Sequence, residues 1–471
     1  MHKEDLYAFA DEEADRLRDL AHQLWENPET ALKEVESARR LSETLERAGF
    51  DVEIGVDELP TAFVATYGSR KPKIGILGEY DALPGLSQEV LTEREPVREG
   101  APGHGCGHNL HGVGAVGGAI VAKHAIENGD LEGTVAYYGC PAEETLVGKV
   151  YMARTGAFAD LDAAMAWHPS DVSSVRLGTA NALNSIEYVF EGQASHAAST
   201  PEGGRSALDA AQLLNTGVEY MREHIPDQAR IHYVITDGGG APNVVPGRAA
   251  AKFFVRSPSR DGVSRLSAWL DDIAAGAAKM TQTEVTRNFL TGCHGYLPNE
   301  RIGRQVWENM QQVGAMEYTG EERQFASDLQ ATISEEDFES RISRYPDEVQ
   351  ATIRDHDMYT EPVEPFDRGD HSAGTADLGD VCWNAPTVQF RGAAWPVGTP
   401  AHTWQAVAAN GDIGERGVVF AAKVFAGTVY DLLTDPSILA EAADEHAETT
   451  GGRDYECAVP DEVSPPTEQV E

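Results

Sequence analysis

The stretch GHGCGHNLHG, residues 103–112, brings one cysteine and three histidines together between glycines. Cys106 and His108 form a C-x-H pair, and a thiolate and an imidazole both suit zinc, manganese or a similar divalent ion. Taken alone, such a pair is more often a turn that contains a histidine than a metal site. The interpretation as a metal site therefore depends on further ligands elsewhere in the chain.

Two adjacent carboxylates, Glu143 and Glu144, follow a strand-like run in GCPAEETLVGK. Because neighbouring residues of a strand point in opposite directions, one carboxylate could bind a metal while the other carries a proton. A solvated charge pair in a loop explains this pattern equally well. His168 in AWHP and His402 in GTPAHTWQ supply imidazoles from other segments. Since α/β enzymes build catalytic metal sites from several strand ends, we expect these groups to converge.

The run GVGAVG, residues 112–117, matches the GxGxxG pattern of dinucleotide-binding loops. Such a loop must directly follow a strand and open a helix. Here the preceding strand-like run ends near Tyr80, and residues 108–128 have the composition of a helix rich in small side chains. We therefore expect these glycines to permit close helix packing rather than to bind a phosphate.

The elements that must position these residues alternate between helices and strands in the first part of the chain. Amphipathic patterns predict helices over residues 4–26 and 33–48, and a run of small residues predicts another over 108–128. Runs rich in β-formers and bounded by glycine or proline predict strands over residues 51–56, 61–68, 73–85, 133–144 and 161–169. This alternation is typical of an α/β sheet that presents functional residues at its carboxyl edge.

The pattern changes near residue 181, where NSIEYVFEGQASHAA alternates like a half-buried antiparallel strand. The runs that follow predict a β-α-β-β-α-β unit, a small α+β domain inserted into the first. We expect a catalytic domain in two parts, residues 1–180 and 293–435, around a dimerisation or lid domain over 181–292. A charged, proline-containing insertion over 317–370 should lie on the surface, and the acidic segment 436–471 is expected to be disordered.

The composition limits the classes of function. A formal net charge of -40 excludes a nucleic-acid-binding protein and favours a solvated, salt-adapted surface, such as that of a halophile's cytosolic protein. No apolar run approaches the roughly 20 residues of a membrane helix, and the charged start lacks the apolar core of a signal peptide, so we expect a cytoplasmic location and no membrane partner. Five scattered cysteines do not form a disulfide framework.

Seven motifs in order carry a resemblance to a known family: GEYDALPG, GHGCGHN, GCPAEE, AWHP, EGQASHAA, GGGAPNVVP and GTPAHTWQ. Together they resemble the aminoacylase and carboxypeptidase G type metallopeptidases, in particular amidohydrolases that act on N-acyl amino acids. The resemblance spans residues 6–433. It implies a zinc-peptidase-like α/β/α catalytic domain with an inserted ferredoxin-like dimerisation domain, and hydrolysis of an amide bond by metal-activated water.

The resemblance also implies a role for each motif residue in the main domain. Cys106 matches a ligand that bridges two metal ions, and the cofactor would be one or two divalent ions, zinc or manganese. Glu143 matches the general base, and Asp81 matches an acidic residue that orients a ligand histidine. The remaining ligands implied are His108, Glu144, His168 and His402.

In the inserted domain, His196 matches a histidine that reaches the partner subunit's active site and polarises the scissile carbonyl. Asn243 and Arg256 match positions associated with binding of the substrate and its carboxylate. The resemblance thus implies a homodimer. It leaves open whether a companion subunit also takes part. Asn109 stands where the subgroup usually has Asp. This difference and the insertion over 317–370 both leave the identity of the substrate open.

Other functions remain open at this point. A dipeptidase or carboxypeptidase of the same family would differ only on the acyl side of the amide bond, and no residue in the sequence identifies that side. A non-catalytic member that binds metal or ligand would keep the same fold, although the intact set of ligands and the intact Glu143 argue against it.

Overall fold

A seven-stranded mixed sheet forms the centre of the main domain in the computed structural model, which describes residues 2–56, 58–129 and 131–467. The strand order is β1-β2-β4-β3-β5-β13-β6. Strands β3, β4, β5 and β13 run parallel, so their carboxyl ends meet at one edge. The strands are β1 (Asp51–Val56), β2 (Leu59–Tyr67), β3 (Lys73–Glu79), β4 (Thr134–Cys140), β5 (Ala163–Ser170), β6 (Ser174–Arg176) and β13 (Thr387–Ala393).

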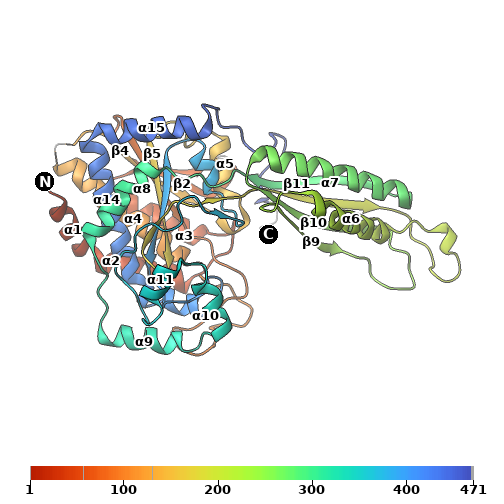
Figure 1. Ribbon diagram of the computed structural model, residues 1–471, viewed down its shortest axis with the longest axis horizontal. Helices are drawn as coiled ribbons and strands as arrows, with labels where there is room; N and C mark the ends of the chain where they lie inside the picture. The colour runs from red at the N-terminus through yellow and green to blue at the C-terminus, as the bar shows by residue number, and fades with distance from the viewer. Residues whose placement is uncertain (1, 57, 130, 468–471) are drawn as a thin grey trace.

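Helices cover both faces of this sheet (Figure 1). The larger core lies between the sheet and α1 (Lys3–Glu12), α2 (Ala14–Glu26), α3 (Val35–Arg47), α4 (His108–Asn128), α8 (Glu300–Val313) and α14 (Arg416–Thr434). The opposite face is covered by α5 (Gly148–Arg154) and α12 (Leu378–Cys382), and α13 (Trp404–Asn410) lies beyond β13 in the chain. The α/β/α architecture expected from the sequence is confirmed.

The glycines of GVGAVG lie inside α4 and permit close packing, as predicted. A Cβ atom on Gly114 would lie 2.6 Å from Trp167 Nε1, and one on Gly118 would lie 2.6 Å from Phe425 Cβ. The run is therefore part of a buried helix and does not form a phosphate-binding loop. Contrary to the expectation that no apolar run approaches the length of a membrane helix, the helical stretch Ile413–Thr434 is long and apolar enough to cross a membrane, but 67% of its apolar window is buried within the protein, as in a core helix.

A second, four-stranded antiparallel sheet forms an arm that projects from the main domain (Figure 1). Its strand order is β11-β8-β10-β9, the ferredoxin-like order expected for the inserted domain. We call this arm the lid. Its elements are β8 (Ala182–Glu191), α6 (Ala207–Met221), β9 (Arg230–Asp237), β10 (Arg248–Ser257), α7 (Arg260–Thr281) and β11 (Glu284–Cys293).

The chain enters the lid through a short parallel pair of strands, β7 (Thr179–Ala180) and β12 (His371–Ser372). The side chain of His371 in β12 connects to the segment that leads into β8, because its ring nitrogens lie 2.8 Å from Thr179 Oγ1 and 2.8 Å from Asn181 Oδ1. His371 is therefore structural and marks the junction between main domain and lid. The described residues also form the 3-10 turns η1 (Glu143–Thr145), η2 (Pro201–Gly203), η3 (Arg222–His224) and η4 (Ile413–Glu415).

The segment 317–370, which we call the insertion, folds into three helices with a small core of its own. The helices are α9 (Gly320–Gln330), α10 (Glu335–Ile342) and α11 (Asp347–Ile353). Ile342, Tyr345 and Ile353 from this segment pack against Val172 and Val397 of the main domain. The insertion is therefore fixed to the main domain by apolar contacts.

The prediction of disorder for residues 436–471 is wrong for the described part, which ends at residue 467. Residues Pro436–Thr450 form helix α15, whose Ile438 and Ala442 are buried in the main domain. Glu445 accepts hydrogen bonds from the backbone N–H groups of Glu300 and Arg301, and so caps the first turn of α8. The acidic composition of α15 does not indicate this packing, because few of its residues are apolar. One of its acids, Glu445, caps α8. Residues 468–471 lie outside the described part of the chain.

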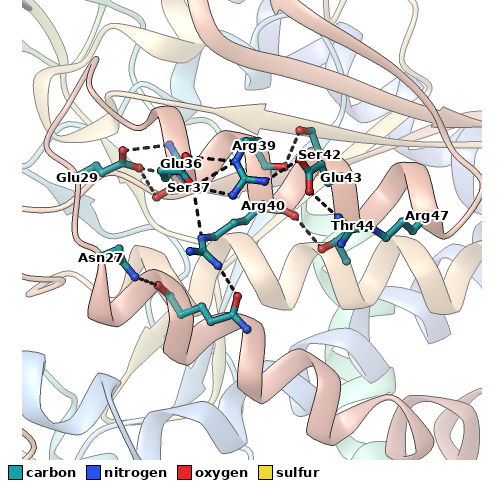
Figure 2. Close-up of polar contacts among 11 residues, drawn as sticks. Asn27, Glu29, Glu36, Ser37, Arg39, Arg40, Ser42, Glu43, Thr44 and Arg47 are labelled. Atoms are coloured by element: carbon teal, nitrogen blue, oxygen red, sulfur yellow. Dashed lines mark hydrogen bonds and ion pairs between the residues drawn. The ribbon is translucent and has the colours of Figure 1, made fainter.

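Acidic and basic side chains alternate along the exposed side of α3 (Figure 2). Arg39 lies 2.7 Å from the carboxylates of both Glu36 and Glu43, and Arg47 lies 2.6 Å from Glu43. The carboxylate of Glu29 accepts hydrogen bonds from the backbone N–H groups of the first turn of α3. Such exposed pairs within one helix stabilise it only slightly.

Raising KCl from about 0.1 M to about 1 M should raise the melting temperature, since the Debye length shortens from about 10 Å to about 3 Å. The net charge of -40 makes repulsion among acidic groups the dominant surface term, and salt screens it. Salt also weakens the ion pairs of α3, but these are too weak to reverse the trend. Calorimetry at both concentrations measures the shift; an unchanged or lower melting temperature at high salt would contradict it.

Candidate metal centre

The predicted ligands come together at the carboxyl edge of the main sheet. Cys106 precedes α4, whose first residue is His108. His168 lies near the end of β5, and Glu144 lies in η1 just after β4. His402 comes from the loop before α13. Segments far apart in the sequence thus supply one site, as the sequence analysis predicted.

Two groups of potential ligand atoms share one sulfur. The first group is Cys106, His108 and His168, and the second is Cys106, Glu144 and His402; within each, the atoms lie within 4.8 Å of one another. Cys106 Sγ lies 3.4 Å from His168 Nε2, and His402 Nε2 lies 3.4 Å from Glu144 Oε1. A thiolate common to both groups is placed to bridge two metal ions.

Buried polar atoms without partners support this interpretation. His108 Nε2 and Glu144 Oε1 are both buried and have no hydrogen-bond partner among the described residues. Unsatisfied buried polar groups are costly and rare in folded proteins. A bound cation would satisfy both atoms, and the set of sulfur, imidazole and carboxylate ligands suits zinc or manganese. The residues therefore fit divalent metal ions.

Hydrogen bonds fix the orientation of two ligand rings. Asp81 Oδ1 lies 2.8 Å from His108 Nδ1, and its other oxygen accepts the backbone N–H of Glu144. His168 Nδ1 donates to the carbonyl of Pro169 at 2.7 Å. Both rings therefore present Nε2 to the site. The contact between Asp81 and His108 has the form by which carboxylates commonly orient a ligand histidine in metal sites.

The local charges favour the ligand forms of the side chains. Burial raises the pKa of the Cys106 thiol, but His168 and His108 outweigh it and lower the pKa to about 6. The nearby Cys106 and Glu144 raise the pKa of His402 to about 10. In the metal-free protein, imidazolium ions thus balance the thiolate and the carboxylate, and bound metal ions would take over this positive charge.

At about pH 7, iodoacetamide should modify metal-free protein selectively at Cys106. With a pKa of about 6 this thiol is mostly thiolate at neutral pH, and its reactivity should rise through pH 6. Burial raises the pKa of the four other cysteines, Cys140, Cys293, Cys382 and Cys457, which keeps them as thiols. Peptide mapping by mass spectrometry locates the label. Prior loading with zinc or manganese should protect Cys106; a label elsewhere, or no protection, would show that Cys106 is not a ligand.

Glu143 lies beside this centre, but on a different element from the one predicted. Strand β4 ends at Cys140, and Ala142 has a φ of 55°, which starts the 3-10 turn Glu143–Thr145. The two carboxylates therefore diverge because of a tight turn, and not because of strand alternation. Burial, followed by the charges of Glu79 and Asp377, raises the pKa of Glu143 well above its usual value. Its carboxylate lies within 4.8 Å of ligand atoms of His108 and Glu79.

A buried ionic cluster that the sequence did not predict adjoins the centre through Glu79 and His108. Lys149 Nζ lies 2.7 Å from Glu79 and 2.6 Å from Asp377, and all three side chains are buried. Glu79 also lies 3.4 Å from His108 Nε2 and 3.3 Å from His111 Nε2. Glu79 could have been predicted from its spacing, because it lies two residues before Asp81 in one extended segment. The lysine, in contrast, follows no recognisable motif.

The three predicted lid residues lie outside this cluster. His196 and Asn243 are exposed and belong to two loops joined by the isolated bridge between His196 and Val244. Both loops lie at the end of the lid farthest from the main domain (Figure 1), because β8 leads away from the main domain. Ten residues of β8, at about 3.3 Å each, span roughly 30 Å. His196 is therefore remote from the metal centre of its own chain.

Arg256, in β10, lies nearer the base of the lid. Its guanidinium lies over the ring of Phe254 at 5.0 Å, and its Nε is buried without a hydrogen-bond partner among the described residues. Burial lowers the pKa of this guanidinium. A partly buried cation with unused donors is suited to binding a carboxylate.

Comparisons with known proteins agree with this geometry. A family model described as Peptidase family M20/M25/M40 matches residues 75–431. The chain is 39% identical over 476 residues to one of the subunits of the p-aminobenzoyl-glutamate hydrolase of Escherichia coli, covering 98% of this chain and 99% of that protein. It is 32% identical over 328 residues to the Xaa-Arg dipeptidase of Homo sapiens, covering 64% of this chain and 70% of that protein.

Solved structures share the fold. A dinuclear metal-binding peptidase from Bacillus subtilis, the YXEP protein, superposes with a TM-score of 0.58 and 18% identity, covering 89% of this chain and 98% of that chain. The aminobenzoyl-glutamate utilization protein from Klebsiella pneumoniae gives a TM-score of 0.58 at 17% identity, covering 88% and 98%. With the family model, the relatives and the ligand groups in agreement, the chain belongs to Peptidase family M20/M25/M40 and is a metal-dependent hydrolase of amide bonds.

Proposed function

We propose that this enzyme cleaves the amide bond of N-acyl amino acids, with p-aminobenzoyl-glutamate as the preferred substrate. The observation that carries the proposal is the pair of ligand groups that share Cys106, with Glu143 beside them. The similarity to the E. coli hydrolase over nearly the full length of both chains supports the choice of substrate.

The proposed reaction divides the chemistry between metal and protein. Two divalent ions, held by Cys106 and the terminal ligands, would lower the pKa of a water molecule and polarise the amide carbonyl. Glu143 accepts a proton from the attacking water, whose oxygen bonds to the carbonyl carbon. Glu143 then returns this proton to the leaving nitrogen as the C–N bond breaks. The products are a carboxylic acid and an amine, so the atoms balance without another reactant.

The proposed substrate contacts come from the lid. The free donors of Arg256 are suited to the carboxylate of an amino acid, and Asn243, beside His196, would bind a polar group. His196 Nδ1 accepts hydrogen bonds from the N–H groups of Ala198 and Ser199, which leaves Nε2 as the donor. An imidazole donor directed at the carbonyl would stabilise the developing oxyanion.

The distance of His196 from its own metal centre supports a homodimer in which each lid completes the other subunit's site. Strand β9 is an edge strand of the lid sheet, and its exposed side chains include Tyr233, Val234 and Ile235. An exposed apolar edge strand commonly pairs with another strand. We propose that a second copy of this chain covers it.

Three further proposals follow from the relatives and the cysteines. Because the E. coli relative is named as one subunit of a hydrolase, a companion subunit remains a candidate partner. All five cysteines are free, and three are buried, which is typical of a protein from a reducing compartment and supports a cytoplasmic location. The similarity to the human Xaa-Arg dipeptidase makes dipeptide hydrolysis the second candidate function.

A panel of amides tests the proposal. Protein treated with a chelator and then given manganese or zinc would be assayed for amine release from p-aminobenzoyl-glutamate, N-acyl amino acids and dipeptides with a basic C-terminal residue. Metal-dependent release with the highest kcat/KM for p-aminobenzoyl-glutamate is expected. A higher kcat/KM for the dipeptides would favour the second candidate, and no release from any compound by metal-loaded protein would contradict both.

A further inference from the structure

The loop of residues 395–402, which carries the proposed ligand His402, is held from both the main domain and the insertion. On the main-domain side, the backbone N–H of His402 donates to the carbonyl of Gly105 at 2.9 Å, and that of Trp395 donates to the carbonyl of Ser170 at 3.0 Å. The backbone N–H of Val397 donates to the carbonyl of Asp357 at 2.8 Å, and Gln330 Nε2 donates to the carbonyl of Val397 at 2.9 Å. The Val397 side chain is fully buried in the small core of the insertion. The N–H and the carbonyl of Val397 are therefore both held by the insertion, which supplies none of the proposed ligands.

The next residue of the loop fits closely against the insertion. Gly398 has a φ of +84°, and a Cβ atom on it would lie 2.3 Å from the ring of Phe338 in α10. Its backbone N–H donates to Asp171 at 3.1 Å. Glycine is therefore required here both for its conformation and for the close approach of the ring.

Asp171 connects this loop to the segment that follows the ligand His168. Its side chain is fully buried, and Arg341 approaches it with two nitrogens, Nη2 at 2.5 Å and Nε at 3.1 Å. The hydroxyl of Tyr345 also donates to it. A buried carboxylate is tolerated when it is paired and hydrogen-bonded in this way. Asp171 thus fixes the loop of His402 to α10 and to the end of β5 at one point.

His402 itself needs such support. It has a φ of +63°, which is uncommon for a residue with a side chain, and its side chain is 51% exposed. A residue keeps such a positive φ only where the surrounding structure holds its backbone in place. In contrast, His108 begins the buried helix α4, and His168 lies in a strand paired on the sheet with β13.

We propose that the insertion is the positioning element for His402, acting through Gln330, Phe338 and the Arg341–Asp171 pair. The inference rests on the proposed ligand set. Loosening these contacts should weaken the metal site formed by Cys106, Glu144 and His402, while the site formed by Cys106, His108 and His168 keeps its ion. The insertion therefore controls how tightly the second ion is held.

Cobalt titration of chelator-treated protein tests this inference without relying on activity. Absorption spectra follow coordination, and calorimetry gives the affinities. Wild type should bind two ions. The variants Arg341→Met and Gln330→Ala should each bind one ion as wild type does and the other at least tenfold more weakly. Arg354→Met is the matched control, because Arg354 lies in the same insertion but pairs only with exposed groups, and it should bind both ions normally.

His402→Ala separates failure of this inference from failure of the ligand set. If His402→Ala still binds both ions normally, the proposed ligand set is wrong. If it loses one ion while Arg341→Met and Gln330→Ala bind two ions normally, the positioning role is wrong. Equal weakening in Arg354→Met would also overturn it. Circular dichroism checks folding, and if Arg341→Met does not fold, Gln330→Ala and Phe338→Ala, which retain the ion pair, decide the question.

Discussion

Replacing Glu143 with glutamine should lower kcat by at least about 10³-fold while both metal ions remain bound. The amide keeps the size of the side chain but cannot accept the proton of the attacking water. Glu143 lies beside the proposed ligands but belongs to neither of the two groups that share Cys106, so its replacement should leave metal affinity nearly unchanged. Steady-state kinetics with p-aminobenzoyl-glutamate and elemental analysis of the variant measure the two quantities.

Glu43→Gln provides a control for this substitution, since Glu43 is an acid of α3 whose ion pairs among the described residues are to Arg39 and Arg47. It should keep the kcat of wild type. A Glu143→Gln enzyme that keeps more than about one tenth of wild-type kcat would exclude Glu143 as the general base. Loss of metal in this variant would instead assign Glu143 to the ligands.

The second large effect is expected from His196→Ala, which should lower kcat by about 10²–10³-fold, the usual cost of removing a donor to an oxyanion. His196 lies at the far end of the lid, so the loss should arise in the partner subunit's site. Metal content and melting temperature should stay near those of wild type, because the side chain is exposed.

Mixing two inactive variants distinguishes action between subunits from action within one subunit. A dimer of one His196→Ala subunit and one Glu143→Gln subunit contains one intact site if His196 crosses to its partner. After random reassociation, half the dimers are mixed and half of their sites are intact, so activity should return to about one quarter of wild type. If His196 acts within its own chain, no activity should return.

The sequence predicted the position of the metal centre better than its local geometry. Residues 108–128 were predicted as a helix, and α4 has these bounds, because small residues and a clear start limit the choices. The ligands were predicted at strand ends, and four parallel strands bring those ends to one edge. The turn at Glu143 was not predictable, because it depends on a positive φ at Ala142, a residue that rarely adopts one.

Other features depended on contacts between distant segments, which periodicity does not reveal. Lys149 reads as an ordinary residue of a short helix, yet it is fully buried between Glu79 and Asp377. Helix α15 has an acidic composition typical of a disordered tail, but Glu445 caps α8. The role of the insertion likewise emerges only from its contacts with Asp171 and the loop of His402.

Anomalous X-ray diffraction from crystals grown with manganese tests the central claim most directly. The account predicts two peaks on either side of Cys106 Sγ, one near His108 and His168 and the other near Glu144 and His402. A single peak among Glu79, His108 and Glu143, which form a third group of potential ligands, would contradict the assignment of Glu143 as the base. Metal-loaded protein without any peak at Cys106 would contradict the proposed centre itself.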